Sequence, residues 1–278
     1  MGRAVRSTIA IIGAGKVGSA MIKALKQCFP SLRIIATGRS KATLLNARSL
    51  GAEATRDNNY AVSEAEFIIL SVKPHHFPIV AKQVKSDSWR NKVVVSVMAG
   101  IRLNTLKRVL KGSEVYRAMP NINIVVRKSS TAITDVKGEC RDSVNEVFEC
   151  FGRVYWVPEE YLDIWTGLAG SGPAFIAEIV DALVLGAVAS GMSRDLAYKA
   201  ILDVLEGTAE YLRSNPSIHP AEMRDAVTTP AGTTIRGLMT MESRGVKAAL
   251  MRTVEAAYKR SARIGKDIDE YVKKELSI

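Results

Sequence analysis

The sequence predicts an α/β fold in two parts, a parallel sheet covered by helices and then a domain of helices alone. Strand-like and helix-like patterns alternate through residues 1–160. The strand-like runs are continuous in Val, Ile and Leu, which is typical of parallel strands buried on both faces. After residue 160, long helix-like patterns rich in Ala, Leu and Val follow. We therefore expect domains at 1–160 and 161–278.

The opening stretch TIAIIGAGKVGSAM, residues 8–21, has the pattern of strand, tight turn and helix. The apolar run 9–12 precedes Gly13, Gly15 and Gly18 in the spacing G-x-G-x-x-G. In this motif the first Gly allows the turn, the second lets the backbone approach a pyrophosphate, and the third lets helix and strand pack closely. The unpaired amides at the helix start favour phosphate. The combination predicts a Rossmann-type dinucleotide-binding domain, in preference to a plain strand–helix turn.

The remaining elements follow from the spacing of apolar residues. We expect further strands at 32–37, 66–72, 92–98 and 114–118, and late strands at one edge, 131–134 and 154–157. Helices are expected at 40–50, 77–84 and 103–110, around 161–165, and at 175–190, 195–212, 235–241 and 246–264. The apolar faces of the later helices are wide, which indicates burial against a partner subunit or, alternatively, within the domain.

Composition excludes several classes of protein. Of the 278 residues, 47% are hydrophobic, and the opening residues do not resemble a signal peptide. The longest apolar segment, 182–192, is too short to span a bilayer. We expect a cytoplasmic protein with no membrane partner.

Cysteine and histidine usage points away from disulfides and metals. Cys28, Cys140 and Cys150 are odd in number and lack C-x-x-C spacing, so we expect buried free thiols. The three His residues are too scattered for a zinc site, and no metal is expected.

The net charge of +11 is concentrated in the first part of the chain, where residues 1–160 carry 25 basic and 13 acidic side chains. A basic surface there suits an anionic cofactor, although a solvated surface explains much of the excess. No Lys/Arg cluster is interleaved with aromatic residues, so we expect no nucleic-acid partner.

The end of the second predicted strand bears on the choice of cofactor. An acid at this place would bind the adenosine ribose of NAD, but the chain has Arg39, Ser40 and Lys41 there. These side chains can bind a 2′-phosphate. We expect NADPH to be preferred, with NADH possible. The alternative is a surface turn whose Ser40 caps the next helix, and the two roles are compatible.

Two later strands end in segments that should also contact the cofactor. Val72, Lys73 and Pro74 follow one strand, and Ala99 and Gly100 follow the next. Ligands lie at the carboxyl ends of parallel strands. We expect backbone contacts here in preference to a catalytic Lys.

Two predicted helix starts in the second half share one chemistry. In 170–175, Ser171 and Gly172 precede a Pro, and in 228–235, Thr229 precedes another. Pro suits the first helical position, Thr229 could be the N-cap, and small residues leave the amides uncovered. Such a pocket would hold a small anion such as a carboxylate, unless both are ordinary caps.

The sequence offers no Ser-His-Asp arrangement, metal ligands or His general acid. Hydride transfer to a C=N bond needs little acid–base apparatus, because a protonated iminium is already electrophilic and positioning supplies most of the catalysis. A ketone would call for a Lys or His donor.

Taken together, the motifs resemble the pyrroline-5-carboxylate reductase family over nearly the whole chain. The matching segments, in the family's order, are GAGKVGSAM (13–21), SVKPHH (71–76), VSVMAG (95–100), RAMPN (117–121), GLAGSGPAF (167–175) and DAVTTPAGTTIRGL (225–238).

The resemblance implies reduction of 1-pyrroline-5-carboxylate to L-proline, the last step of proline biosynthesis, with NADPH as hydride donor. It also implies a homodimer with interlocked helical domains, which often assembles into a ring of dimers. Thr234 would be catalytic and hydrogen-bond the imine nitrogen. The residues expected to bind substrate are Ser171, Thr229, Ala231, Gly232 and Thr233. Those expected to bind the cofactor are Gly13, Ala14, Gly15, Lys16, Val17, Gly18, Arg39, Ser40, Lys41, Asn58, Val72, Lys73, Pro74, Ala99 and Gly100.

The chain departs from the family pattern at two places. It has Ala231-Gly232 where the family usually has Gly-Gly, and Ile122-Asn123 where the family usually has Thr-Pro. A methyl group at position 231 would tighten the carboxylate loop.

Three other functions remain open from the sequence. One is an NADP-dependent imine reductase and another is a β-hydroxyacid dehydrogenase, which would carry a catalytic Lys on the helix after the Gly-rich segment. Residues 170–183 contain no Lys. The third is an NADP-binding regulatory protein without turnover, against which the intact Thr233–Thr234 pair argues.

Overall fold

The computed structural model describes residues 8–278, which form two compact units. The first unit holds residues 8–171 and Ala256–Ile278, and the second holds Gly172–Glu255. The strands are β1 Ile9–Ile12, β2 Ile34–Thr37, β3 Glu53–Thr55, β4 Phe67–Leu70, β5 Val93–Ser96, β6 Glu114–Met119, β7 Ser129–Thr134 and β8 Gly152–Val157.

The α-helices of the first unit are α1 Lys16–Cys28, α2 Lys41–Ser49, α3 Asn58–Glu64, α4 Phe77–Gln83, α5 Leu103–Val109, α6 Arg141–Glu149 and α7 Tyr161–Trp165. Short 3₁₀ segments are η1 Pro74–His76, η2 Ser86–Trp89 and η3 Ile122–Val126, and η4 Thr166–Gly170 is a π-helix. The second unit contains α8 Gly172–Ala189, α9 Arg194–Ser214, α10 Pro220–Ala226, α11 Thr233–Ser243 and the start of α12 Val246–Leu276.

The strands of the first unit form one sheet in the order β3-β2-β1-β4-β5-β6-β7-β8. The first six in this order pair in parallel, β6 and β7 pair antiparallel, and β7 and β8 are again parallel. Successive strands β1 to β3 are added toward one edge of the sheet, and β4 and the strands after it toward the other edge. The strand order therefore reverses between β1 and β4. A crevice for a ligand opens at the carboxyl ends of the strands at such a point.

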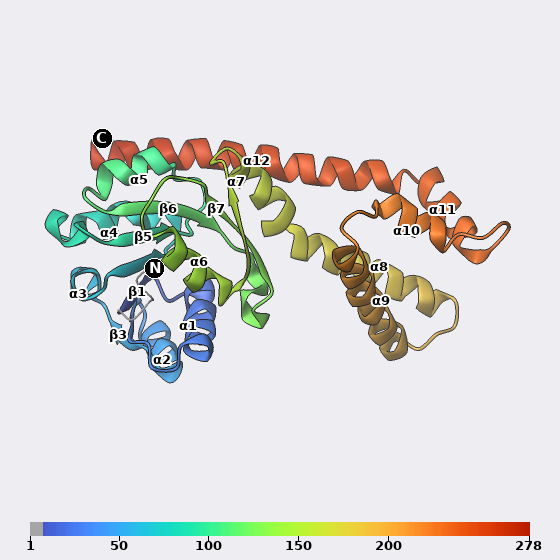
Figure 1. The fold of residues 1–278 in the computed structure, drawn as a ribbon, viewed down its shortest axis with the longest axis horizontal. Coiled ribbons are helices and arrows are strands. Elements are labelled where there is room, and N and C mark those ends of the chain that lie inside the picture. The colour runs from blue at the N-terminus through green and yellow to red at the C-terminus, as the bar shows by residue number, and fades with distance from the viewer. Residues whose placement is uncertain (1–7) are drawn as a thin grey trace. The chain divides into compact units, whose positions relative to one another are not determined.

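Helices cover both faces of this sheet (Figure 1), as the continuous apolar strands predict. Alternate residues of β1 point to opposite faces. Ile9 and Ile11 pack in one core with α1, α2 and α6, whereas Ala10 and Ile12 pack in another with α3, α4 and α5. Val272, near the end of α12, is fully buried in this second core.

The predicted fold class is confirmed, with a Rossmann-like sheet domain and a helical part. The expected strands and helices appear within a few residues of their predicted bounds, except for the last helix, α12, which ends at Leu276 and not at residue 264. Four short elements were not predicted from the sequence, namely β3, α3, α6 and α10. The edge strand β3 has a single buried residue, Ala54, so it lacks the long apolar run by which the other strands were recognised.

The compact units divide the chain at other places than the expected domains. Residues 161–171 and 256–278, expected in the helical domain, pack with the sheet. The physical reason is that α12 runs on to Leu276, beyond its predicted end, and buries Val272.

The segments α7, η4 and α8 follow one another without a break, and the resulting helix Tyr161–Ala189 is long and apolar enough to cross a membrane. The prediction that no segment has that length is therefore wrong, because residues 182–189 form only the end of a longer helix. Little of its most apolar part is buried within the chain. Such a helix is typical of a membrane span or of a surface buried against another protein chain.

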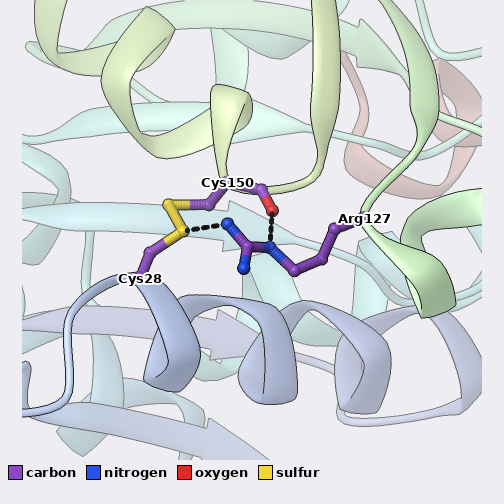
Figure 2. Close-up of a disulfide and its surroundings, with 3 residues drawn as sticks. All are labelled: Cys28, Arg127 and Cys150. Atoms are coloured by element: carbon purple, nitrogen blue, oxygen red, sulfur yellow. Dashed lines mark hydrogen bonds between the residues drawn. A yellow bond between two sulfur atoms is a disulfide. The ribbon is translucent and has the colours of Figure 1, made fainter.

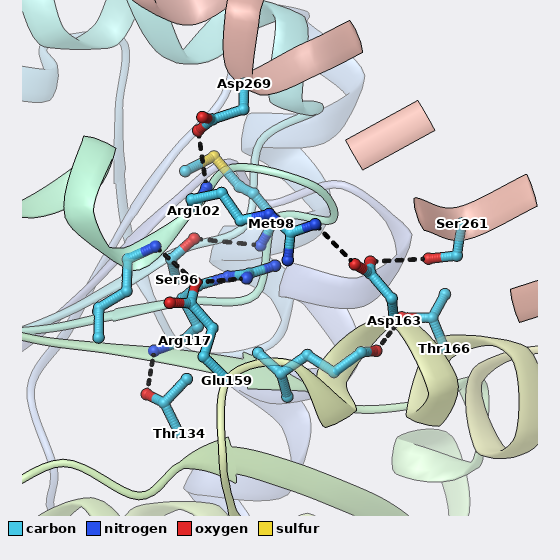
Figure 3. A network of polar contacts seen from close by, with 12 residues as sticks. Ser96, Met98, Arg102, Arg117, Thr134, Glu159, Asp163, Thr166, Ser261 and Asp269 are labelled. Atoms are coloured by element: carbon cyan, nitrogen blue, oxygen red, sulfur yellow. Dashed lines mark hydrogen bonds and ion pairs between the residues drawn. The ribbon is translucent and has the colours of Figure 1, made fainter. Parts of the chain in front are cut away.

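A network of charged groups connects the end of α12 to the rest of the first unit (Figure 3). Asp269 accepts a hydrogen bond from the backbone amide of Arg102 at 2.8 Å and pairs with Lys273 at 2.6 Å. The buried carboxylate of Asp163 in α7 accepts from the Arg102 guanidinium at 2.9 Å and from Ser261 of α12 at 3.1 Å. Each buried carboxylate thus has partners from two chain segments.

A buried arginine and its half-buried partner lie beside this network. The Arg117 side chain is only 2% exposed, and it donates to Glu159 at 2.7 Å. The same carboxylate oxygen of Glu159 accepts from the amide of Leu103 at 2.7 Å. This carboxylate therefore caps the start of α5 and neutralises a buried guanidinium at the same time.

Cys28 and Cys150 form a disulfide, so the expectation of free thiols is wrong for these two residues (Figure 2). Cys28 ends α1 and Cys150 follows α6, and their Cα atoms lie 6.0 Å apart although 122 positions separate them in sequence. Arg127 donates to Cys28 Sγ and to the Cys150 carbonyl, each at 3.2 Å. Counting cysteines could not reveal the pair, because packing on one face of the sheet brings the two helix ends together.

Reduction of this disulfide is expected to destabilise the first unit by about 2–4 kcal/mol, because the bond closes a long loop in the unfolded chain. The measurement is the melting temperature with and without a phosphine reductant. Cys140→Ser should keep the sensitivity to reductant, and Cys28→Ser should lose it. An unchanged melting temperature of the reduced wild type would contradict the prediction.

Stability should depend on pH through Asp269. Burial alone would raise the pKa of Asp269, but hydrogen bonds from Lys273 and the Arg102 amide outweigh it and lower the pKa. A lowered pKa in the folded state stabilises the fold above the ordinary value of about 4. This contribution is lost as the pH falls through the folded-state pKa.

We therefore expect Asp269→Asn to cost about 1–3 kcal/mol at neutral pH, and less as the pH falls below about 4. Urea unfolding at several pH values measures the difference. Asp267→Asn, at an exposed position of the same helix, is the matched control and should cost little at any pH. A difference that grows with acidity would reject this role of Asp269.

Candidate functional site

In the turn between β1 and α1, glycine is present at three positions, each for a different physical reason. Gly13 has φ +102°, and a side chain there would collide with Val72. A Cβ on Gly18 would lie 2.3 Å from the Gly13 carbonyl oxygen, so only glycine permits this packing. A Cβ on Gly15 would meet nothing within 4 Å, so its backbone faces open space. This is the arrangement that the motif predicts for a phosphate approaching the turn.

The start of α1 is open to an anion. Gly15 is its N-cap residue and provides no side-chain hydrogen bond to the first amides. Hydrogen bonds to neighbouring segments fix the turn. The Gly13 amide donates to Thr37 Oγ1 at 3.1 Å, and the Ser71 hydroxyl donates to the Gly13 carbonyl at 2.6 Å. The first amides of a helix carry positive partial charge, so a fixed anion site results.

A cleft of about 510 Å³ lies over this turn, within the first unit. It is bordered by the carboxyl ends of β1, β2 and β4, as expected for a sheet whose direction reverses at β1. Its lining residues are Gly13, Ala14, Gly15, Thr37, Gly38, Arg39, Ser40, Thr43, Arg56, Asn58, Ser71, Val72, Lys73, His76, Ile79, Val80 and Gln83.

The charged side chains that line this cleft are all basic. Arg39 follows β2, Arg56 follows β3 and Lys73 follows β4. Arg39 donates from Nη1 to His76 Nε2 at 3.2 Å. Burial lowers the pKa of His76, and the charges of Arg39, His75 and Lys73 lower it further. The cleft thus combines guanidinium groups with a neutral imidazole and suits a strongly anionic ligand.

The predicted cap of the next helix is present. Ser40 is the N-cap of α2 and accepts from the Thr43 amide at 3.1 Å. Asn58 begins α3 and donates to Gln83 at 2.6 Å, so its side chain is fixed at the wall of the cleft.

Other predicted cofactor residues lie outside the cleft lining. They are Lys16, Val17, Gly18, Lys41, Pro74, Ala99 and Gly100. Gly100 has a packing reason of its own, since a Cβ there would lie 2.8 Å from Gly265 Cα in α12. Their contacts with a cofactor stay predictions.

The second expected site lies in the second unit, at the start of α11. Gly232 is the N-cap and supplies no side-chain hydrogen bond, so the first amides of α11 have no side-chain cap. Thr229 is therefore not the N-cap, and the Pro that follows it is not the first helical residue; both predictions were wrong. The chain makes a further turn, in which the Gly232 amide donates to the Thr229 carbonyl at 3.1 Å.

This turn nevertheless brings the Thr229 hydroxyl to the helix start. A Cβ on Gly232 would lie 2.3 Å from Thr229 Oγ1. Ala231 has φ +58°, the left-handed region that favours glycine. The departure from the family's Gly-Gly thus strains the backbone, at about 1–2 kcal/mol for an L-residue. The tightening of the loop by this methyl group stays a prediction.

The other predicted helix start is present, since α8 begins at Gly172, but it is not a free N-terminus. Residues 161–170 are already helical, and the π-helix η4 leads through Ser171 into α8. The Ser171 amide and hydroxyl both donate to the Thr166 carbonyl, at 2.9 and 3.2 Å. Substrate binding by Ser171 stays a prediction without this support.

Comparisons with known proteins identify the family. Residues 159–264 match the family description "Pyrroline-5-carboxylate reductase dimerisation", and residues 8–100 match "NADP oxidoreductase coenzyme F420-dependent". A pyrroline-5-carboxylate reductase of Methanosarcina acetivorans is 36% identical over 265 residues, covering 93% of this chain and 98% of the relative. The chain belongs to the pyrroline-5-carboxylate reductase family.

Solved structures agree with this membership. The 1-pyrroline-5-carboxylate reductase of Streptococcus pyogenes is 30% identical with a TM-score of 0.81, over 92% of this chain and 98% of that one. A pyrroline carboxylate reductase of Plasmodium falciparum, solved with NADP bound, has a TM-score of 0.82 at 23% identity and covers 95% of this chain and 100% of that one. The Plasmodium falciparum structure shows that this chain shares its fold.

For this family member, sequence reasoning missed several residues of the cleft. Arg56 was overlooked because β3 was not recognised, although Arg56 directly follows that strand. His76 lies in the segment SVKPHH (71–76), which resembles the family, but its residue type and spacing do not predict a contact with Arg39. Only the pairing of β2 and β4 with β1 brings these loops together.

Proposed function

We propose that this chain is an NADPH-dependent pyrroline-5-carboxylate reductase, which reduces the C=N bond of 1-pyrroline-5-carboxylate to give L-proline. The observation that carries the proposal is a 36% identical reductase that aligns over nearly all of both chains. The basic cleft over the glycine turn and the uncapped start of α11 support it independently.

The residues of the first unit fit the proposed cofactor. The amides at the start of α1 would bind its pyrophosphate, and the open space over Gly15 admits that group. Arg39, Ser40 and Arg56 would bind the 2′-phosphate at the mouth of the cleft. When bound, the nicotinamide supplies the hydride.

The loop before α11 suits the substrate's carboxylate. Amides of residues 233 and 234 and the hydroxyl of Thr229 would bind the carboxylate, because they converge where the helix dipole is positive. The Thr234 hydroxyl would hydrogen-bond the imine nitrogen and fix the plane of the ring. A protonated iminium becomes a neutral amine on gaining hydride, so the protein need not supply a further proton.

We extend the proposal to a homodimer formed through the second unit. Large apolar side chains are exposed there within a single chain. Examples are Ile176, Leu183, Leu196, Val204, Val227, Met239 and Met251. A second copy would bury them, in agreement with the dimerisation family that matches this region. A further ring of dimers, a cytoplasmic location and weaker use of NADH complete the proposal.

The decisive experiment combines the protein with 1-pyrroline-5-carboxylate and NADPH, and measures both cofactor oxidation and proline. Cofactor binding without turnover would instead favour a regulatory protein. Turnover confined to other imines or to hydroxyacids would favour an imine reductase or a dehydrogenase.

Thr234→Ala is expected to lower kcat about 5–150-fold with little change in NADPH affinity, since it removes a hydrogen bond to the imine that is worth about 1–3 kcal/mol. Steady-state kinetics and NADPH titration measure the two quantities. Thr234→Ser retains the hydroxyl and is the matched control, with most of the activity expected to remain. Equal losses in kcat and in cofactor affinity would contradict the assigned role.

Arg39→Ala is expected to weaken NADPH binding about 10–100-fold while leaving NADH unaffected, because a charge-assisted contact to the 2′-phosphate is lost. Measuring KM for both cofactors gives the ratio. Lys23→Ala removes an exposed cation of α1 that does not line the cleft, and should leave the ratio unchanged. If Arg39→Ala left the ratio unaltered, the 2′-phosphate would be bound elsewhere.

A further inference from the structure

The cleft contains a histidine, His76, whose side chain hydrogen-bonds to Arg39. His76 Nε2 lies 3.2 Å from Arg39 Nη1. A guanidinium can only donate, so this ring nitrogen must accept through its lone pair. His76 therefore has to be neutral, with its proton on Nδ1, for the contact to exist.

The surroundings of His76 favour that neutral form. The side chain is half-buried in η1, and burial lowers its pKa. The charged and titratable groups around it are Arg39 from the turn after β2, and Lys73 and His75 from its own segment, all of which lower the pKa further. Arg56, from the turn after β3, adds another positive charge to the same cleft.

Arg39 needs such a partner because it is exposed on a turn. Among residues 8–278, no carboxylate pairs with it; its hydrogen bond goes to His76. An acidic partner would hold the guanidinium equally well but would cancel the charge that attracts a phosphate. A neutral imidazole orients the guanidinium and leaves its charge intact.

We propose that His76 is a positioning residue that sets the preference for a 2′-phosphorylated dinucleotide by holding the Arg39 guanidinium at the mouth of the cleft. The inference rests on the proposed use of NADPH and assigns a residue beyond those expected to touch the phosphate. A side chain ordered before binding costs less to order on binding, which amounts to roughly a two- to tenfold gain in affinity. NAD lacks the 2′-phosphate, so its affinity should not depend on His76.

The test is equilibrium binding of NADP⁺ and NAD⁺ by calorimetry, without turnover. The variants are His76→Ala, His76→Gln, Arg39→Ala and the double variant His76→Ala/Arg39→Ala. We expect His76→Ala to weaken NADP⁺ binding roughly two- to tenfold and to leave NAD⁺ binding unchanged. His76→Gln keeps a neutral acceptor and should restore most of the affinity. In the Arg39→Ala background, loss of the imidazole should have no further effect.

Two results would overturn the role of His76 alone. One is an equal loss of affinity for NADP⁺ and NAD⁺ in His76→Ala, which would mean that the imidazole only contributes to the shape of the cleft. The other is a loss that persists without Arg39, which would mean that His76 contacts the phosphate itself. A wild-type protein that binds NADP⁺ no more tightly than NAD⁺ would overturn the proposed cofactor preference, and this role with it.

Discussion

The close approach of α1 to the turn after β1 is the constraint on which the rest of the first unit depends. The Gly18 backbone packs so near the Gly13 carbonyl that a methyl group would not fit, and Gly13 in turn packs against Val72. This contact aims the uncapped start of α1 at the carboxyl edge of the sheet. The ends of β2 and β4 meet at the same edge, because both pair with β1. The loops after them, with Arg39, Lys73 and His76, then face one cleft.

The two units offer the same physical device to the two proposed anions. In each, a helix begins after a glycine that offers no side-chain cap, so backbone amides are left to a ligand. The devices differ in what surrounds them. Guanidinium groups and an imidazole surround the first, as a multiply charged phosphate requires, whereas hydroxyl groups surround the second, which suits a single carboxylate. In the second loop, Ala231 adopts the left-handed backbone conformation that favours glycine, which is a local strain at the proposed substrate site.

Much of the candidate site could be predicted from the sequence because it depends on local chemistry. The three glycines, the absence of an acid after β2 and the Ser40 cap all follow from residue types within a few positions. The helix starts were harder to predict. Pro at 173 and 230 indicated two first turns, but the π-helix η4 continues into α8, and an extra turn delays α11 to Thr233. Both outcomes depend on backbone hydrogen bonds, at Thr166 and Thr229, that residue preference does not specify.

The sequence by itself determined the fold class, the glycine turn and the kind of ligand. Each depends on residues close together in the chain, through apolar periodicity, glycine spacing and the signs of charges. Only the tertiary structure decided which distant groups meet. The Cys28–Cys150 disulfide, the contact of His76 with Arg39 and the anchoring of α12 by Asp269 join segments far apart in the chain. Sheet order and helix packing create these contacts, and the types and spacing of neighbouring residues specify neither of them.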